Sequence, residues 1–122
     1  MSGVALLQMH FTLADLPRLR LRVGDTARLV GLDEGRCEEL VLAAYELACN
    51  AILHGGGGGN LRMYRMGGVL RCQVSDDGPG FACTAESFGD GLGLARQLTD
   101  GIEIHSGAAG GVVTLMVVPP LK

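Results

Sequence analysis

The sequence is poor in lysine, and this shortage narrows the ways in which it could hold a nucleotide. Its only lysine is Lys122, the last of 122 residues. A Walker A loop and a protein-kinase active site each use a lysine inside the chain to contact phosphates. Both kinds of nucleotide site are therefore excluded, and any nucleotide must be held by other groups.

Long apolar runs and an excess of basic residues are also missing. No apolar run approaches the roughly 20 residues of a membrane span, and the first seven residues lack the basic and apolar regions of a signal peptide. We therefore expect a cytoplasmic protein that does not cross a membrane. The net charge of −3 argues against a nucleic-acid surface, which needs a basic face.

The four cysteines, Cys37, Cys49, Cys72 and Cys83, show no C-x-x-C or Cys/His pairing. A zinc site would need such a pairing, so the spacing favours buried reduced thiols over a metal site or disulfides. A chain of this length with 48% hydrophobic residues can build one core, which predicts a single domain over residues 1–122.

The longest predicted helix begins after Asp33 and ends near His54. Its stretch 40–53 is almost entirely apolar, apart from Glu46 and Asn50. These two residues are one helical turn apart and share one stripe of the helix. A carboxylate and an amide in such surroundings are costly unless something pairs with them. The stripe therefore predicts a cavity that holds a polar ligand.

The other predicted elements place this helix in an α+β two-layer sandwich. In chain order they are a strand over 4–13, a helix over 16–30, strands over 61–66 and 69–75, a third helix ending at Gly101, and strands over 102–106 and 112–118. Gly67 and Gly68 indicate a two-residue hairpin. Paired strands with grouped helices predict a mixed, mostly antiparallel sheet with three helices on one face. We expect the run 55–59, five glycines, to be a mobile loop beside the site.

Arginines accumulate on the helix predicted over 16–30. They are Arg18, Arg20, Arg22 and Arg28, mainly on faces other than the apolar one. This pattern is typical of a solvated face, or of a contact surface for an acidic partner. The apolar positions Leu16, Leu19 and Val23 would permit a homodimer.

Two glycine motifs follow the predicted hairpin. Asp76 ends a strand and is followed by Gly78 and Gly80, which would let the backbone approach a flat ligand while the carboxylate accepts from an exocyclic amine. Further on, a glycine-rich turn opens the third helix and would present backbone N–H groups to phosphates. Its residues are Gly89, Gly91, Leu92 and Gly93. Each motif alone is also compatible with ordinary turns.

The order of these motifs resembles the N, G1 and G2 boxes of the GHKL ATPase superfamily, which includes gyrases, histidine kinases and mismatch-repair ATPases. The resemblance implies the Bergerat fold with bound ATP. It implies that Asn50 holds Mg²⁺, that Asp76 binds adenine, and that the glycines shape the pocket. Gly111 stands where relatives often carry a threonine near adenine, so Thr114 is the remaining candidate for that contact.

Within the superfamily, the chain resembles small bacterial serine/threonine kinases that act as anti-sigma factors or switch kinases. The resemblance implies transfer of the γ-phosphoryl group of ATP to a serine or threonine of an anti-anti-sigma (STAS-domain) partner, with Glu46 as general base. It also implies a possible sigma-factor partner and dimerisation through the first strand and helix. Two alternatives stay open: a nucleotide-dependent regulator that sequesters its partner without kinase activity, and a detached ATPase domain of a sensor histidine kinase.

Overall fold

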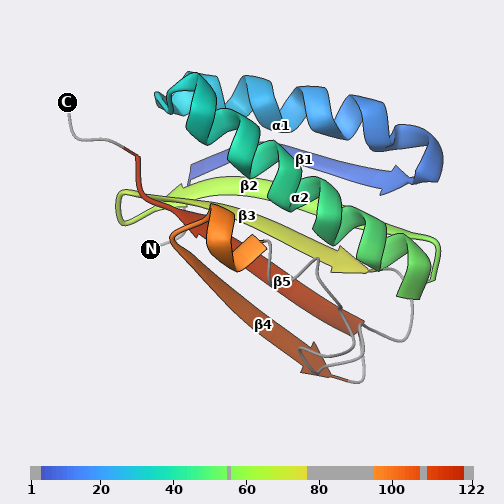
Figure 1. Ribbon diagram of the computed structural model, residues 1–122. Coiled ribbons are helices and arrows are strands. Elements are labelled where there is room, and N and C mark those ends of the chain that lie inside the picture. Colours follow the sequence, from blue (N-terminus) through green and yellow to red (C-terminus); the bar gives the residue numbers. More distant parts are fainter. Residues whose placement is uncertain (1–3, 55, 77–94, 108–109, 120–122) are drawn as a thin grey trace.

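A five-stranded sheet forms one layer of the molecule and helices form the other (Figure 1). The computed structural model describes residues 4–54, 56–76, 95–107 and 110–119. The strands are β1 (Val4–Thr12), β2 (Gly58–Met66), β3 (Val69–Asp76), β4 (Gly101–Gly107) and β5 (Gly110–Val117). Their order in the sheet is β1-β2-β3-β5-β4, and all four pairings are antiparallel. The expected α+β sandwich with a mostly antiparallel sheet is thus confirmed.

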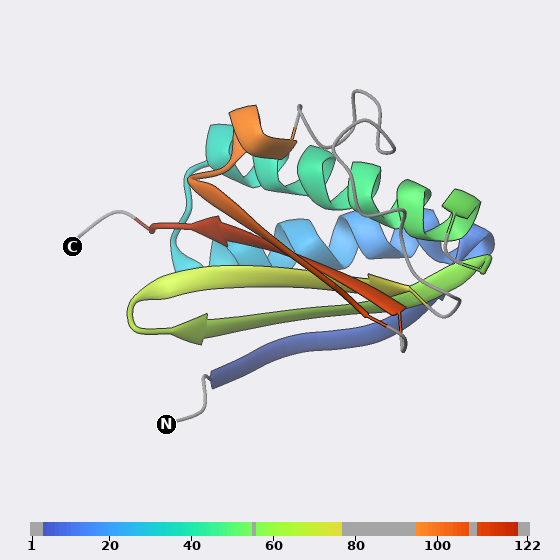
Figure 2. The same cartoon turned by 90° about the horizontal axis from the view of Figure 1, so that it is seen from below.

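The helices all lie on one face of the sheet (Figure 2). A short 3-10 turn, η1 (Leu13–Asp15), leads from β1 into α1 (Leu16–Val30), and α2 is the longer helix (Glu34–His54). Residues 95–98 form a further helical segment on the same face. Gly31 ends α1 with a φ of 100°, a conformation that glycine adopts without steric cost. The chain then reverses, so α1 and α2 run antiparallel (Figure 1).

The core lies between the sheet and the two long helices. Side chains alternate along each strand, and the buried set on β3 and β5 faces the helices: Leu70, Cys72, Val74, Val113, Leu115 and Val117. The α1 residues Leu16, Leu19 and Val23 belong to this core, with exposed fractions of 6%, 0% and 0%. The suggestion that these three side chains permit a homodimer is therefore wrong, because the chain's own core already covers them.

Glycines explain two connections of the sheet. Gly67 and Gly68 have φ values of 62° and 79°, which confirms the two-residue hairpin between β2 and β3. The glycine run after α2 differs from the expected loop, because Gly58 and Gly59 are the first residues of β2. A Cβ atom at Gly59 would lie 2.0 Å from the carbonyl oxygen of Ser75. Close backbone packing therefore requires glycine there.

The cysteines agree with the prediction of reduced thiols as far as the structure describes them. Cys37, Cys49 and Cys72 are free; Cys37 and Cys72 are buried and Cys49 is half-buried. Burial raises the pKa of the Cys72 thiol to about 12. Among the residues described, no helix combines the length and the hydropathy that a membrane crossing needs.

Candidate functional site

The candidate site is organised by the side of α2 that carries Glu46 and Asn50. Arg36 lies on this same side, because positions 36, 43, 46 and 50 recur at helical spacing. The Arg36 guanidinium donates to the Asp100 carboxylate (Nη2 to Oδ2, 2.8 Å), and Asp100 follows the helical segment 95–98. This side of α2 therefore faces the part of the chain that follows the glycine-rich turn.

Asn50 is buried near the end of α2 and has an unsatisfied amide. Its exposed fraction is 9%, and its Nδ2 atom makes no hydrogen bond within the described part of the chain. Buried polar atoms are almost always hydrogen-bonded, and leaving one unmade costs about 1–3 kcal/mol. Glu46, one turn earlier, is half-buried. The amide is thus a polar group that a ligand at this end of α2 would satisfy.

Asp76 is the last residue of β3 and is 8% exposed. It lies on the helix-facing side of the sheet, in register with the buried residues Cys72 and Val74. The backbone N–H of Gly111, near the start of β5, donates to its Oδ2 atom at 3.1 Å. β3 packs beneath α2, and both elements end at the same end of the molecule (Figures 1 and 2). The fold thereby brings Asp76 and Asn50 to one end of the two layers.

Thr114 does not join this group. It pairs with Gln73 of β3 and with Glu103 of β4, in the middle of β5. Its neighbours Val113 and Leu115 face the helices, so Thr114 faces the opposite side of the sheet from Asp76. This register gives no support to the expected contact between Thr114 and adenine, because Thr114 is three positions from Gly111 and an odd separation changes the face.

The remaining predicted site residues lie outside the part of the chain that the structure describes. They are Gly78, Gly80, Gly89, Gly91, Leu92 and Gly93, all within residues 77–94. Sequence reasoning overlooked Arg36 and Asp100. The two residues are 64 positions apart, so no local pattern in the sequence links them. The one weak signal was that Asp100 is acidic and directly precedes Gly101, where the third helix was predicted to end.

The donor set at Asn50 is compatible with Mg²⁺ held together with a phosphate group. Magnesium in nucleotide sites takes one or two protein oxygens, and water and phosphates complete its shell. Asn50 can present its amide oxygen to the metal, while its unpartnered Nδ2 can donate to a phosphate oxygen. No cluster of three or more His, Cys, Asp or Glu that could hold a metal without a phosphate is found among the described residues.

Comparisons with known proteins agree with this architecture. The family model of the histidine kinase-like ATPase domain matches residues 9–117. No curated protein matches the chain. Among solved structures, the RsbU and RsbW domains of Rv1364c from Mycobacterium tuberculosis match with a TM-score of 0.70 and 24% identity, over 92% of this chain and 32% of that one.

The structural match shows that the fold is shared, and this chain spans about a third of the length of that relative. The family match covers nearly the whole sheet and both long helices. It includes Glu46 and Asn50 on α2 and Asp76 at the end of β3. From this match and this fold, the chain belongs to the histidine kinase-like ATPase domain family.

Proposed function

We propose that this chain is an ATP-binding serine/threonine kinase of the partner-switching type, acting on a hydroxyl group of an anti-anti-sigma (STAS-domain) protein. The observation that carries the proposal is the buried Asn50 amide, unsatisfied within the described residues and one turn after the half-buried Glu46. The match to a chain with RsbU and RsbW domains supports a partner-switching role.

In the proposed reaction, each described residue has a separate task. Asp76 accepts a hydrogen bond from the exocyclic amine of adenine, and Asn50 would hold the Mg²⁺ that accompanies the phosphates. Bound Mg²⁺ would neutralise charge on the β- and γ-phosphates. The hydroxyl oxygen of the acceptor forms a bond to the γ-phosphorus, and Glu46 accepts the proton of that hydroxyl. At the same time the bond between the γ-phosphorus and the β,γ-bridging oxygen breaks, and ADP leaves. Most of the rate enhancement would come from this positioning.

Calorimetric titration with ATP, with and without Mg²⁺, tests the nucleotide site. We expect magnesium-dependent binding that Asn50→Ala abolishes. Asn60→Ala is the matched control, because Asn60 is exposed on β2 and should leave binding unchanged. Equal binding by the wild-type and Asn50→Ala chains would refute the proposed role of the amide.

Transfer is tested separately from binding. Glu46→Gln should retain ATP binding but lose phosphorylation of a STAS-domain acceptor, whereas Glu39→Gln, on the same helix, should retain both. Acid-stable phosphate on the acceptor indicates serine or threonine. Phosphorylation that persists in Glu46→Gln would remove the general-base role, and ATP binding without any transfer by the wild-type chain would favour a sequestering regulator.

A further inference from the structure

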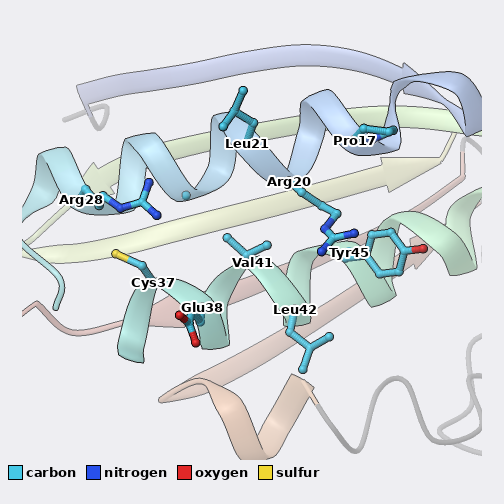
Figure 3. A pocket seen from close by; sticks show the side chains of 10 residues that line it. Pro17, Arg20, Leu21, Arg28, Cys37, Glu38, Val41, Leu42 and Tyr45 are labelled. Carbon is cyan, nitrogen blue, oxygen red and sulfur yellow. The ribbon is translucent and has the colours of Figure 1, made fainter. Parts of the chain in front are cut away.

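A groove runs between α1 and α2 (Figure 3). It has a volume of about 540 Å³, and its lining includes Leu21 and Gly24 from α1 and Val41 and Leu42 from α2. Its end at Tyr45 lies about 180° around α2 from Arg36. Leu42, another lining residue, is one helical turn before Glu46, so the groove borders the candidate site, whereas Tyr45 lies about 140° around α2 from Asn50.

The groove exposes apolar side chains on both of its edges. Leu21 on α1 is 62% exposed and Leu42 on α2 is 42% exposed. Between them, Gly24 lacks a side chain where a Cβ atom would lie 3.4 Å from Val41. The floor is therefore hollow at its centre and the edges are apolar, as in grooves that receive the apolar face of a helix.

The α1 edge is basic, although the chain as a whole is acidic. Helix α1 contains four arginines and one aspartate, whereas the net charge of the chain is −3. Arg28, at one end of the groove, is neutralised by Glu34 (2.8 Å) and Asp25 (3.2 Å). Arg20, at the other end, has no carboxylate partner in the described part of the chain. Its guanidinium lies instead over the ring of Tyr45, 5.3 Å from the centroid (Figure 3).

Arg20 thus presents an unneutralised positive charge that is held in place by the cation–π contact with Tyr45. Glu38 lies on the opposite edge, so the two edges differ in charge. The part of α1 that lines the groove, from Pro17 to Arg28, is about 16 Å long at 1.5 Å per residue. The groove is therefore long enough to receive about three turns of a partner helix.

We propose that this groove docks an amphipathic helix of a protein partner. The apolar face of that helix, rich in leucine-like residues, would pack on the floor of the groove, and acidic residues along one edge of the helix would meet Arg20. The positive edge selects for acidic helices and against basic ones. The inference does not rest on phosphoryl transfer, because it uses only the apolar and charged side chains of the groove itself.

Selection from a displayed library of helical peptides tests the proposal. The peptides are about 18 residues long, with the apolar stripe and both flanking edges randomised. We expect enrichment of amphipathic peptides with glutamate or aspartate along one edge. No enrichment, or enrichment of basic edges, overturns the proposal.

Fluorescence anisotropy with an enriched peptide then locates the site. Leu21→Glu should weaken binding by about tenfold or more, and the matched control Leu29→Glu should not, because Leu29 is on the same helix, 85% exposed and outside the groove. Arg20→Glu should reduce the preference for acidic over basic edges. Asn50→Ala should retain peptide binding, which separates this surface from the nucleotide site.

Two results would overturn the location or the occupant. Binding that survives Leu21→Glu unchanged places the peptide elsewhere. Sedimentation equilibrium that shows a wild-type dimer, lost in Leu21→Glu and retained in Leu29→Glu, assigns the groove to a second copy of this chain.

Discussion

The backbone N–H of Gly111 donates a hydrogen bond to the carboxylate of Asp76 across 3.1 Å, joining the end of β3 to the start of β5. One oxygen of a proposed ligand-binding carboxylate is therefore already engaged by the sheet. Asp76 has a structural task as well as its proposed task toward adenine, and substitutions can separate the two.

Asp76→Asn and Asp76→Ala should differ in stability but not in nucleotide binding. The asparagine oxygen can still accept from Gly111, whereas alanine leaves a buried N–H unpaired and should lower the free energy of unfolding by about 1–3 kcal/mol. Both variants lose the carboxylate that we propose for adenine, so both should lose ATP binding. Urea denaturation and calorimetry measure the two effects, and ATP binding retained by Asp76→Asn would contradict the adenine role.

Gly59→Ala should destabilise the fold. Its new Cβ atom would meet the Ser75 carbonyl oxygen at 2.0 Å and Phe11 Cζ at 3.1 Å, so the backbone of β3 must move just before Asp76. Overpacking of this kind costs about 1–3 kcal/mol. Chemical denaturation measures the loss, and an unchanged midpoint would show that β2 and β3 can separate enough to admit the added methyl group.

Gly24→Ala should have the opposite effect. Gly24 lies inside α1, and a Cβ atom there would make its nearest contact at 3.4 Å, with Val41. Alanine is favoured over glycine in a helix interior by about 1 kcal/mol. We expect a rise in the free energy of unfolding of up to about that amount, measured in the same way. A loss of stability would mean that α1 and α2 cannot adjust to the added methyl group.

Asp100→Ala should loosen the attachment of the helical segment 95–98 to α2. The Asp100 Oδ2 atom accepts from Arg36 at 2.8 Å and from the N–H of Val118 at 2.7 Å. Both contacts are exposed, so we expect a loss of about 1 kcal/mol, to which the backbone bond and the ion pair both contribute. Arg36→Ala should therefore cost less than Asp100→Ala. Equal losses in the two variants would instead assign the stabilisation to the ion pair.

Stability should fall at alkaline pH because of Cys72. Burial raises the pKa of this thiol to about 12 in the folded chain, above its value of about 9 when unfolded. Between these pH values only the unfolded chain releases the proton, so the free energy of unfolding decreases by about 1.4 kcal/mol per pH unit. Cys72→Ala should show a shallower decline between pH 9 and 11, and equal slopes would show that Cys72 does not contribute.

Local patterns in the sequence were sufficient for most of the elements. The helix over 34–54, the Gly67-Gly68 hairpin and the strand ending at Asp76 follow from spacings of three to four residues, from alternation and from turn chemistry. The stripe of Glu46 and Asn50 was also recognised, since both lie on one helix. The run 55–59 could not be resolved in this way, because glycines have no side chains from which to read a pattern.

The sequence by itself determined which segments are helical or extended and which polar residues share a face of α2, because these properties depend on neighbours within a few positions. Only the tertiary structure decided which distant residues meet: Gly111 with Asp76, Asp100 with Arg36, and Arg20 with Tyr45. It also turned Thr114 away from the site and Leu16, Leu19 and Val23 into the core. These outcomes depend on strand register and helix packing, which are set by the burial of the whole core rather than by any one segment.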